Sequence, residues 1–373
     1  MWKLLIGAGV VTALLLGLFF FGGYKPLRFI GEHEIATGDW VYQEAAVGEI
    51  SGLAYDPVVN VYYAVSDDRG ENGPAGRLYT LDVPIDESGP RDVQIYGMTL
   101  LDSDLQEPGV QTHARDSFDG EEILLTRQRT FLIASERDEN DRPWIREYTE
   151  TGILLREIEL PGQFLGAEGQ GVRSNLAIEA MTLEPDGETL FVANEQALEQ
   201  DGPVSTVEHG TTIRIVQYGL TPTESTIEAQ YAYITEPIFA SPINGSYADN
   251  GVTAMLYVKH LLPRYDLLVV ERSYSAGVGN DVQVFGVKLE KADNVAGVDA
   301  LSYPYGGTAV HKEPLLRISA RSELSDIDVE PDNIEAIALG PKLANGNRTL
   351  ILASDNNFND SQRNLFLAFE IVP

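Results

Sequence analysis

Residues 178–195, IEAMTLEPDGETLFVANE, contain the pattern that decides the fold. Two short runs rich in apolar residues, 178–183 and 189–194, flank the turn-forming stretch Glu-Pro-Asp-Gly at 184–187. Apolar runs of this length on either side of a turn are typical of a β-hairpin. The second run leads directly into an acidic residue, Glu195.

The same arrangement recurs along the chain. It is clear at 50–69 and at 334–357, and weaker copies of the second strand end at 136–137 and 271–272. Repeats separated by roughly 50 to 80 residues are typical of propeller blades with insertions. Because a blade takes roughly 40–50 residues, we predict an all-β fold with a six-bladed β-propeller over residues 27–373.

The N-terminal segment differs from the rest of the chain. After Lys3, residues 4–21 carry no charge, and these 18 residues are long enough for a short membrane-spanning helix. We therefore predict one N-terminal hydrophobic helix, with residues 1–26 acting as a signal anchor or, alternatively, a cleaved signal peptide. Either interpretation places residues 27–373 on the periplasmic or extracellular face of the cytoplasmic membrane. In the first the segment 4–21 anchors the protein in the membrane, and in the second the protein is secreted.

The composition excludes several classes of function. There are 26 Lys and Arg against 57 Asp and Glu, a net charge of −31, which repels nucleic acid and attracts cations. The chain has no cysteine, so a disulfide framework, a thiolate nucleophile and a cysteine-based zinc site are excluded. The sequence also lacks the G-x-S-x-G, H-E-x-x-H and Gly-rich phosphate-binding motifs. Carboxylates remain as the main candidates for chemistry.

Acidic residues occupy related positions in the repeated hairpins. Near the first strand of a hairpin stand Glu49, Glu179 and Glu335. At the end of a second strand stand Asp67, Glu136, Glu195, Glu271 and Asp355. Because the innermost strand of each propeller blade lines the central channel, acids far apart in sequence can converge there. Carboxylate oxygens are the ligands that calcium prefers, so we predict a Ca²⁺ site.

Three acidic residues are followed directly by arginine, in the pairs 68–69, 136–137 and 271–272. Metal ions and guanidinium groups together neutralise the oxygens of a phosphate ester, which favours a small phosphate ester as the ligand. The alternative is that these pairs are salt bridges that tie neighbouring blades together.

Five stretches resemble the family of proteins with a phytase-like, esterase-like domain. They are Ile50–Leu53 with Ser66–Arg69, Ile178–Met181 with Ala193–Glu195 and Gln200–Gly202, Glu271–Asn280, Asn333–Ala336, and Ser354–Asn359. The resemblance implies activity on phosphate esters and recurrent functional acids. In this chain those acids are Asp67, Asp68, Glu179, Glu195, Glu271, Glu335 and Asp355. The chain departs from the family pattern at 115–122, which leaves the roles of Glu121 and Glu122 unassigned.

These observations give a first hypothesis, an exported, metal-assisted hydrolase of phosphoric esters. The predicted catalytic residues are Glu179, Glu335, Arg137 and Arg272. The predicted calcium ligands are Asp67, Asp68, Glu195, Glu271 and Asp355. Two alternatives remain open at this stage: a non-catalytic, calcium-stabilised binding module, and a hydrolase of carboxylic esters or lactones.

Overall fold

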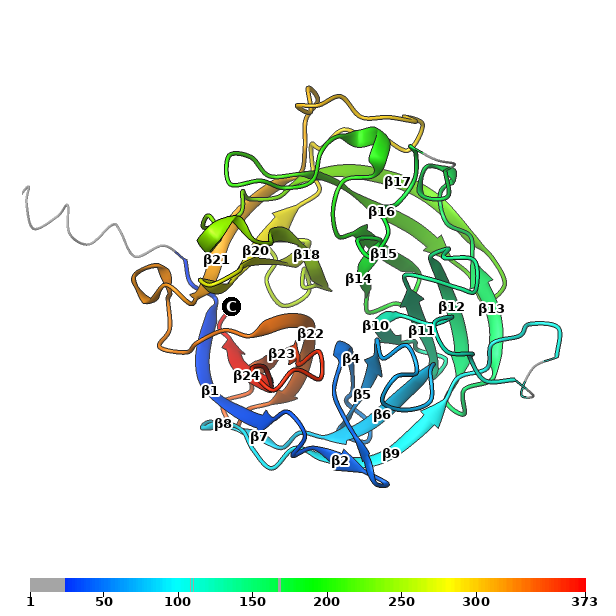
Figure 1. The fold of residues 1–373 in the computed structure, drawn as a ribbon, viewed down its shortest axis with the longest axis vertical. Helices are drawn as coiled ribbons and strands as arrows, with labels where there is room; N and C mark the ends of the chain where they lie inside the picture. The colour runs from blue at the N-terminus through cyan, green and yellow to red at the C-terminus, as the bar shows by residue number, and fades with distance from the viewer. Residues whose placement is uncertain (1–23, 108, 110, 167–168) are drawn as a thin grey trace, which may run out of the picture.

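The computed structural model describes residues 24–107, 109, 111–166 and 169–373, and its regular structure consists of β-strands with four short 3-10 turns. Five four-stranded antiparallel sheets surround a central axis as the blades of a propeller (Figure 1). Blade 1 comprises β4 (Ile50–Asp56), β5 (Val61–Ser66), β6 (Arg77–Asp82) and β9 (Gln94–Leu100). Blade 2 comprises β10 (Gly120–Leu125), β11 (Thr130–Ser135), β12 (Trp144–Thr149) and β13 (Leu154–Ile158). Blade 3 comprises β14 (Ile178–Leu183), β15 (Thr189–Asn194), β16 (Thr212–Leu220) and β17 (Ser225–Ile234).

The last two blades follow the same inside-to-outside order. Blade 4 comprises β18 (Ala248–Tyr257), β19 (Leu267–Ser275), β20 (Gly279–Lys288) and β21 (His311–Ser319). Blade 5 comprises β22 (Asn333–Lys342), β23 (Arg348–Asp355), β24 (Arg363–Ile371) and, as its outer strand, β1 (Leu27–Ala36). Two small ribbons are formed by β2 (Val41–Tyr42) with β3 (Ala45–Ala46) and by β7 (Ile85–Asp86) with β8 (Gly89–Pro90). The 3-10 turns are η1 (Gly162–Phe164), η2 (Glu199–Asp201), η3 (Ile243–Gly245) and η4 (Ser322–Leu324).

The all-β propeller prediction is confirmed, but the predicted number of six blades is wrong, because the structure has five. The chain is long enough for six compact blades, yet long connections such as 101–119 and 289–310 take up residues that the estimate assigned to strands. The predicted hydrophobic helix falls on residues 1–23, which lie outside the described residues. In the described part of the chain, no helix has the length and apolar character needed to cross a bilayer.

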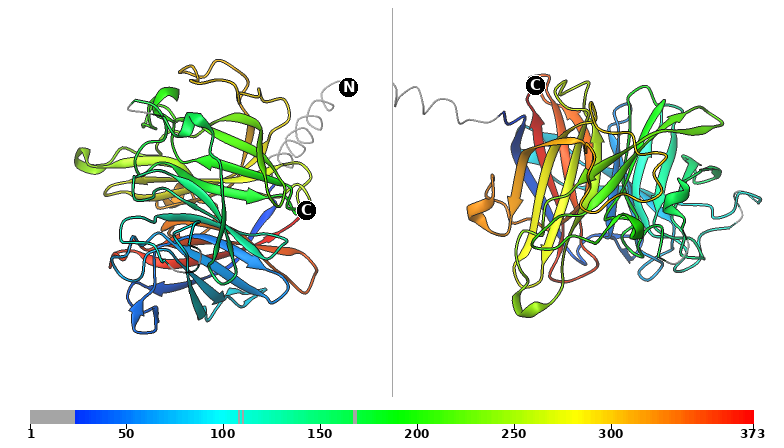
Figure 2. Two further views of the ribbon diagram at one scale, coloured as in Figure 1. Left: turned by 90° about the vertical axis from the view of Figure 1, so that its right-hand side faces the viewer. Right: turned by 90° about the horizontal axis from the view of Figure 1, so that it is seen from above.

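The two ends of the chain close the ring together. β1 pairs antiparallel with β24, from Leu27 opposite Ile371 to Ala36 opposite Arg363. Figure 2 shows the blue β1 beside the red β24 from the side. The first strand of the described chain therefore completes the last blade, so that blade 5 holds both ends of the domain.

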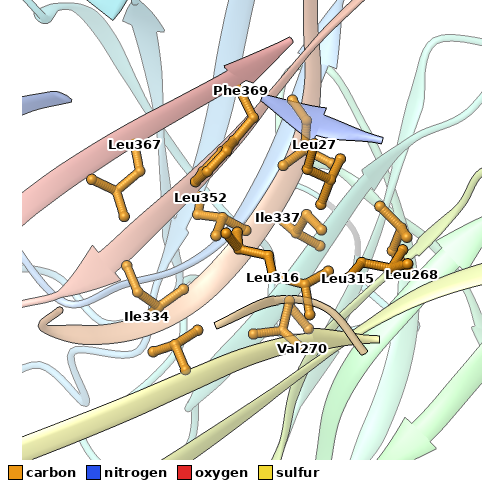
Figure 3. Packing of buried hydrophobic residues seen from close by; sticks show 14 of the residues in the cluster. Leu27, Leu268, Val270, Leu315, Leu316, Ile334, Ile337, Leu352, Leu367 and Phe369 are labelled. Carbon is orange, nitrogen blue, oxygen red and sulfur yellow. The ribbon is translucent and has the colours of Figure 1, made fainter. Parts of the chain in front are cut away.

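Apolar packing between neighbouring blades forms the core. Figure 3 shows the contact between blades 4 and 5, where Val270 and Leu316 lie near Ile334, Ile337 and Leu352. Each blade packs between its two neighbours in the ring. Strands such as β23 are therefore buried on both faces. Burial of one such aliphatic side chain contributes about 1.5–3 kcal/mol, which makes the blade interfaces the main source of stability.

Candidate active site in the central channel

A β-bulge occurs in all five inner strands. The register shifts after the first pair in blades 1, 2 and 3, after the second pair in blade 5 and after the fifth pair in blade 4, and each shift leaves one residue of the inner strand without a partner on the second strand. We call this the bulge position, and it holds Ser51, Glu121, Glu179, Thr253 and Glu335. Bulges redirect a side chain and are common next to active sites. Here the three glutamates line the channel cavity, and Ser51 and Thr253 do not.

The second strands supply a matching set of residues. The residue of the second strand that pairs just before the bulge is followed by the strand-end position, which holds Asp67, Glu136, Glu195, Arg272 and Asp355. All five of these side chains line the channel cavity. The residue two positions before the bulge, which we call the pre-strand position, is Glu49, Asp119, Ala177, Gly251 or Asn333. Equivalent positions of the five blades therefore meet on one axis.

The channel cavity has a volume of about 820 Å³ and is strongly acidic. Its described lining residues include fifteen carboxylates and three arginines. Such an excess of one charge in a partly enclosed space favours cations and repels anions that arrive without a counter-ion.

Seven of these acids form a continuous arc. Three triads place carboxylate oxygens within 4.8 Å of one another, and the first two share Asp67 while the last two share Glu121. We call the whole set the carboxylate arc, and its members are Glu335, Asp355, Asp67, Asp119, Glu121, Glu136 and Glu179. The arc runs from blade 5 through blades 1 and 2 to blade 3.

The carboxylate arc contains buried acids whose pKa values are raised and carboxylate oxygens that have no hydrogen-bond partner among the described residues. Burial, reinforced by Asp355, raises the pKa of Glu335 to about 8, and burial raises that of Glu136 to about 7. Glu121 is only 7% exposed and makes no hydrogen bond or ion pair with any described residue. Asp67 Oδ1 is buried and also lacks a partner within that part of the chain. Buried, unpartnered carboxylate oxygens at this spacing fit a hard divalent cation such as Ca²⁺.

Blade 4 faces the arc with the opposite charge. At the three equivalent positions it carries Gly251, Thr253 and Arg272, with no acid among them. The Arg272 guanidinium lies 3.5 Å from Glu335, 3.7 Å from Glu195 and 3.8 Å from Asp249. Arg272 Nε is buried and has no partner among the described residues. These long contacts leave N–H groups of Arg272 available to an anionic group in the cavity.

Most of the predicted site residues lie in the cavity. Glu179, Glu335, Arg272, Asp67, Asp68, Glu195 and Asp355 all line it. Asp68, however, is already used, because its carboxylate accepts backbone N–H groups of Gly70, Glu71 and Asn72 and pairs with the buried Arg77 at 2.8 Å. Asp68 therefore shapes the loop after β5.

Two predicted residues are not brought together with the others. Glu271 lies outside the cavity and accepts hydrogen bonds from Tyr233 Oη at 2.5 Å and Lys312 Nζ at 2.6 Å. Arg137 also lies outside and donates to Asp119 at 2.9 Å. The cause is a register error of one residue, since neighbouring residues in a strand point to opposite faces. In blade 4 the strand-end position is Arg272, and in blade 2 it is Glu136.

The sequence reasoning missed Asp119 and left Glu121 unassigned. The structure places Glu121 in the cavity and turns Glu122 away from it, into the space that a side chain at Gly52 would fill. The pattern Asp119-Gly-Glu-Glu before an apolar strand was a usable signal. It resembles Asn333-Ile-Glu-Ala before β22 once the bulge is taken into account.

Comparisons with known proteins identify a family and several similar chains. A family model described as Phytase-like, esterase-like activity of phytase, matches residues 45–358. An uncharacterized secreted protein of Arthroderma benhamiae is 22% identical over 188 residues, which span 44% of this chain but only 36% of that relative.

Similar solved structures include a periplasmic gluconolactonase of Pseudomonas aeruginosa, with 12% identity, a TM-score of 0.38 and coverage of 88% of this chain and 90% of that one. A putative 6-phosphogluconolactonase from Bacteroides uniformis has 12% identity and a TM-score of 0.36, with 84% and 80% coverage. The family match extends over most of the propeller and includes the arc and Arg272. This chain belongs to the Phytase-like family, the family described by the esterase-like activity of phytase.

Proposed function

We propose that this protein hydrolyses phosphoric esters in the channel cavity with the help of divalent cations, Ca²⁺ being the first candidate. The observation that carries the proposal is the division of the channel into a carboxylate arc and, on blade 4, the incompletely paired Arg272. The negatively charged oxygens of a phosphoryl group are stabilised by positive groups beside more than one of them. Cations held by the arc would supply positive charge on one side and Arg272 on the other.

The residues of the cavity have three proposed roles, namely holding the cations, binding the phosphoryl group and transferring a proton. The three triads of the arc would hold the cations, which polarise the phosphoryl oxygens and lower the pKa of a bound water when present. Arg272 would donate hydrogen bonds to a phosphoryl oxygen and oppose the charge that develops there.

Glu195 is the carboxyl group best placed to donate a proton. It lies 3.7 Å from Arg272, belongs to none of the triads, and burial raises its pKa well above the usual range. In the reaction a water oxygen bonds to phosphorus and the bond from phosphorus to the alcohol oxygen breaks. Glu195 gives its proton to the departing oxygen, a carboxylate of the arc takes a proton from the attacking water, and that proton returns to Glu195 through solvent.

We also propose that the protein works outside the cytoplasm. The support is the N-terminal apolar segment of the sequence and the description of the Arthroderma relative as a secreted protein.

Calorimetry and a substrate panel test the function. Full-length protein freed of metal with EDTA is titrated with Ca²⁺ and then assayed on p-nitrophenyl phosphate, bis(p-nitrophenyl) phosphate and a lactone. Glu121→Gln is expected to weaken Ca²⁺ binding at least about tenfold and to remove most ester turnover. Glu122→Gln is the matched control, because the next residue has the same chemistry outside the cavity.

Each outcome separates one interpretation from the others. Calcium uptake and phosphate ester turnover that are both lost in Glu121→Gln but kept in Glu122→Gln support the proposal. Calcium uptake without turnover indicates a binding module instead. Turnover of the lactone alone indicates a carboxylic ester hydrolase, and neither uptake nor turnover overturns the proposal.

A further inference from the structure

The wall that blade 4 contributes to the channel cavity differs from the other walls. It consists of Tyr247, Asp249, Arg272, Tyr274 and Asn280, together with Gly279. Among the described lining residues only Tyr247 and Tyr274 are aromatic, and Asp249 is the only acid of this blade. Asn280 Oδ1 is buried and has no partner within the described structure. This wall therefore presents aromatic rings and an unpartnered amide oxygen, which the carboxylate arc lacks.

The two tyrosines form an open wedge. Their ring centroids lie 6.3 Å apart at an interplanar angle of 35°, and Tyr247 is 61% exposed. The space between the rings is too narrow for a flat ring, because stacking on each face needs about 3.5 Å or more. A rounded group can still contact both rings from the open side of the wedge.

Asp249 connects this wedge to the proposed phosphate-binding group. Tyr247 Oη donates to Asp249 Oδ2 at 2.5 Å, and the same oxygen lies 3.8 Å from Arg272 Nη1. The backbone N–H of Tyr274 donates to Asp249 Oδ1 at 3.3 Å. Asp249 therefore contacts both the aromatic wedge and the guanidinium, so that the two lie on either side of a single carboxylate.

The charge of the cavity limits which esters can enter it. Fifteen carboxylates repel a ligand that carries only negative charge, whereas a ligand with its own positive group is attracted. Ammonium groups bind over tyrosine faces within about 6 Å of the ring centroid, and quaternary ammonium groups are recognised in this way. The carboxylate of Asp249 beside the wedge strengthens that attraction.

We infer that the ester carries an amino alcohol, of the choline or ethanolamine type, whose ammonium group binds at Tyr247, Tyr274 and Asp249 while its phosphoryl group faces Arg272. This inference rests on the proposed function and adds the identity of the alcohol. The same headgroup occurs on soluble diesters and on lipids, and the substrates tested below separate the two sources.

A pair of isosteric substrates tests the inference on the full-length protein loaded with Ca²⁺. p-Nitrophenyl phosphorylcholine and p-nitrophenyl neohexyl phosphate have the same shape, but the second has carbon in place of the charged nitrogen. We expect kcat/KM to be about tenfold higher for the choline ester, the size expected of a partly desolvated cation–π contact. Glycerophosphocholine and phosphatidylcholine vesicles, offered separately, show whether the natural source is soluble or a lipid surface.

Three variants test whether the preference for the choline ester depends on the ring of Tyr247. Tyr247→Leu removes one ring and should reduce the choline preference, whereas Tyr247→Phe keeps the ring and should retain it. The control is Tyr96→Leu, because Tyr96 is 64% exposed and donates to Asp82 at 3.0 Å, yet lies outside the cavity. This control should retain the full preference.

Failure of the inference and failure of the proposed function give different results. Equal kcat/KM for the two esters, or a preference that survives Tyr247→Leu, overturns the inference and leaves the hydrolase intact. If neither ester reacts and the phosphate esters of the first panel are not hydrolysed either, the proposed function fails. Calorimetry of phosphocholine against neohexyl phosphate, with and without calcium, then decides the inference: tighter binding of phosphocholine supports it, and equal or absent binding overturns it.

Discussion

At the scale of the residue, Arg272 places a positive charge among the acids of the channel. It is the only cation at the three equivalent positions of the five blades, and Glu335, Glu195 and Asp249 surround it. Breaking a buried charge cluster by removing one partner costs far more than the net stability of the intact cluster.

Arg272→Gln is expected to lower the free energy of unfolding by about 3–5 kcal/mol at pH 9 in the presence of EDTA, and by much less at pH 6. The difference arises because Glu335, with a pKa of about 8, is ionised at pH 9 and protonated at pH 6. Urea denaturation at both pH values measures the effect, with Arg264→Gln as an exposed control. An equal loss at the two pH values would contradict this account.

Residue types could be predicted from the sequence better than their orientation. Glu136-Arg137 and Glu271-Arg272 are the same dipeptide, but the acid faces the cavity in the first and the arginine does so in the second. Which of two neighbours faces the channel depends on strand pairing, and pairing is a contact between distant segments. The sequence therefore indicated an acidic channel but assigned Glu271 and Arg137 to the wrong side of their strands.

At the scale of the element, the bulge in each inner strand is the feature that builds the site. It adds one residue that has no ladder partner, and in blades 2, 3 and 5 this residue is a glutamate that lines the channel cavity. In blade 2 the following residue, Glu122, then occupies the space beside Gly52 of β4. Gly52 allows this close approach because it has no Cβ.

Gly52→Ala should therefore destabilise the contact between blades 1 and 2. The new Cβ would lie 2.7 Å from Glu122 Cα and 2.8 Å from its Oε1, so backbone must move. We expect a loss of about 1–3 kcal/mol, measured by urea denaturation. Gly297→Ala is the control, since nothing lies within 4 Å of a Cβ there. If both variants lose the same stability, steric contact at Gly52 is not the cause.

The hairpins themselves were predictable. The segments expected at 50–65, 178–194 and 334–353 appear as β4 with β5, β14 with β15, and β22 with β23. Their apolar runs and turn residues are local features of the chain. The bulges and the blade number were not predictable in the same way, because both depend on how separate segments pack.

At the scale of the whole molecule, the stability of the metal-free protein should depend strongly on pH. The pKa values of Glu335 and Glu49 are raised to about 8, that of Glu136 to about 7 and that of Asp355 to about 6, in each case first by burial. Between pH 4.5 and about 8 the folded protein therefore binds more protons than the unfolded chain, so its stability falls as pH rises.

We expect the Tm in EDTA to rise as the pH is lowered from 8.5 to 5. Saturating Ca²⁺ should raise the Tm most at the high end of this range, because bound cations replace the missing protons. Differential scanning calorimetry across the range measures both effects. A Tm that stays constant in EDTA, or that falls toward pH 5, would show that these acids are not the dominant titrating groups.

The closure of blade 5 by β1 and β24 also sets an order of events during synthesis. A ribosome makes β1 near the start and its partner, residues 363–371, at the very end of the described chain. Until then β1 has no strand to pair with, and blade 5, which carries Asp355 of the carboxylate arc, lacks β24. A nascent chain therefore cannot assemble the complete carboxylate arc, and the acidic channel forms only when translation of the domain is finished.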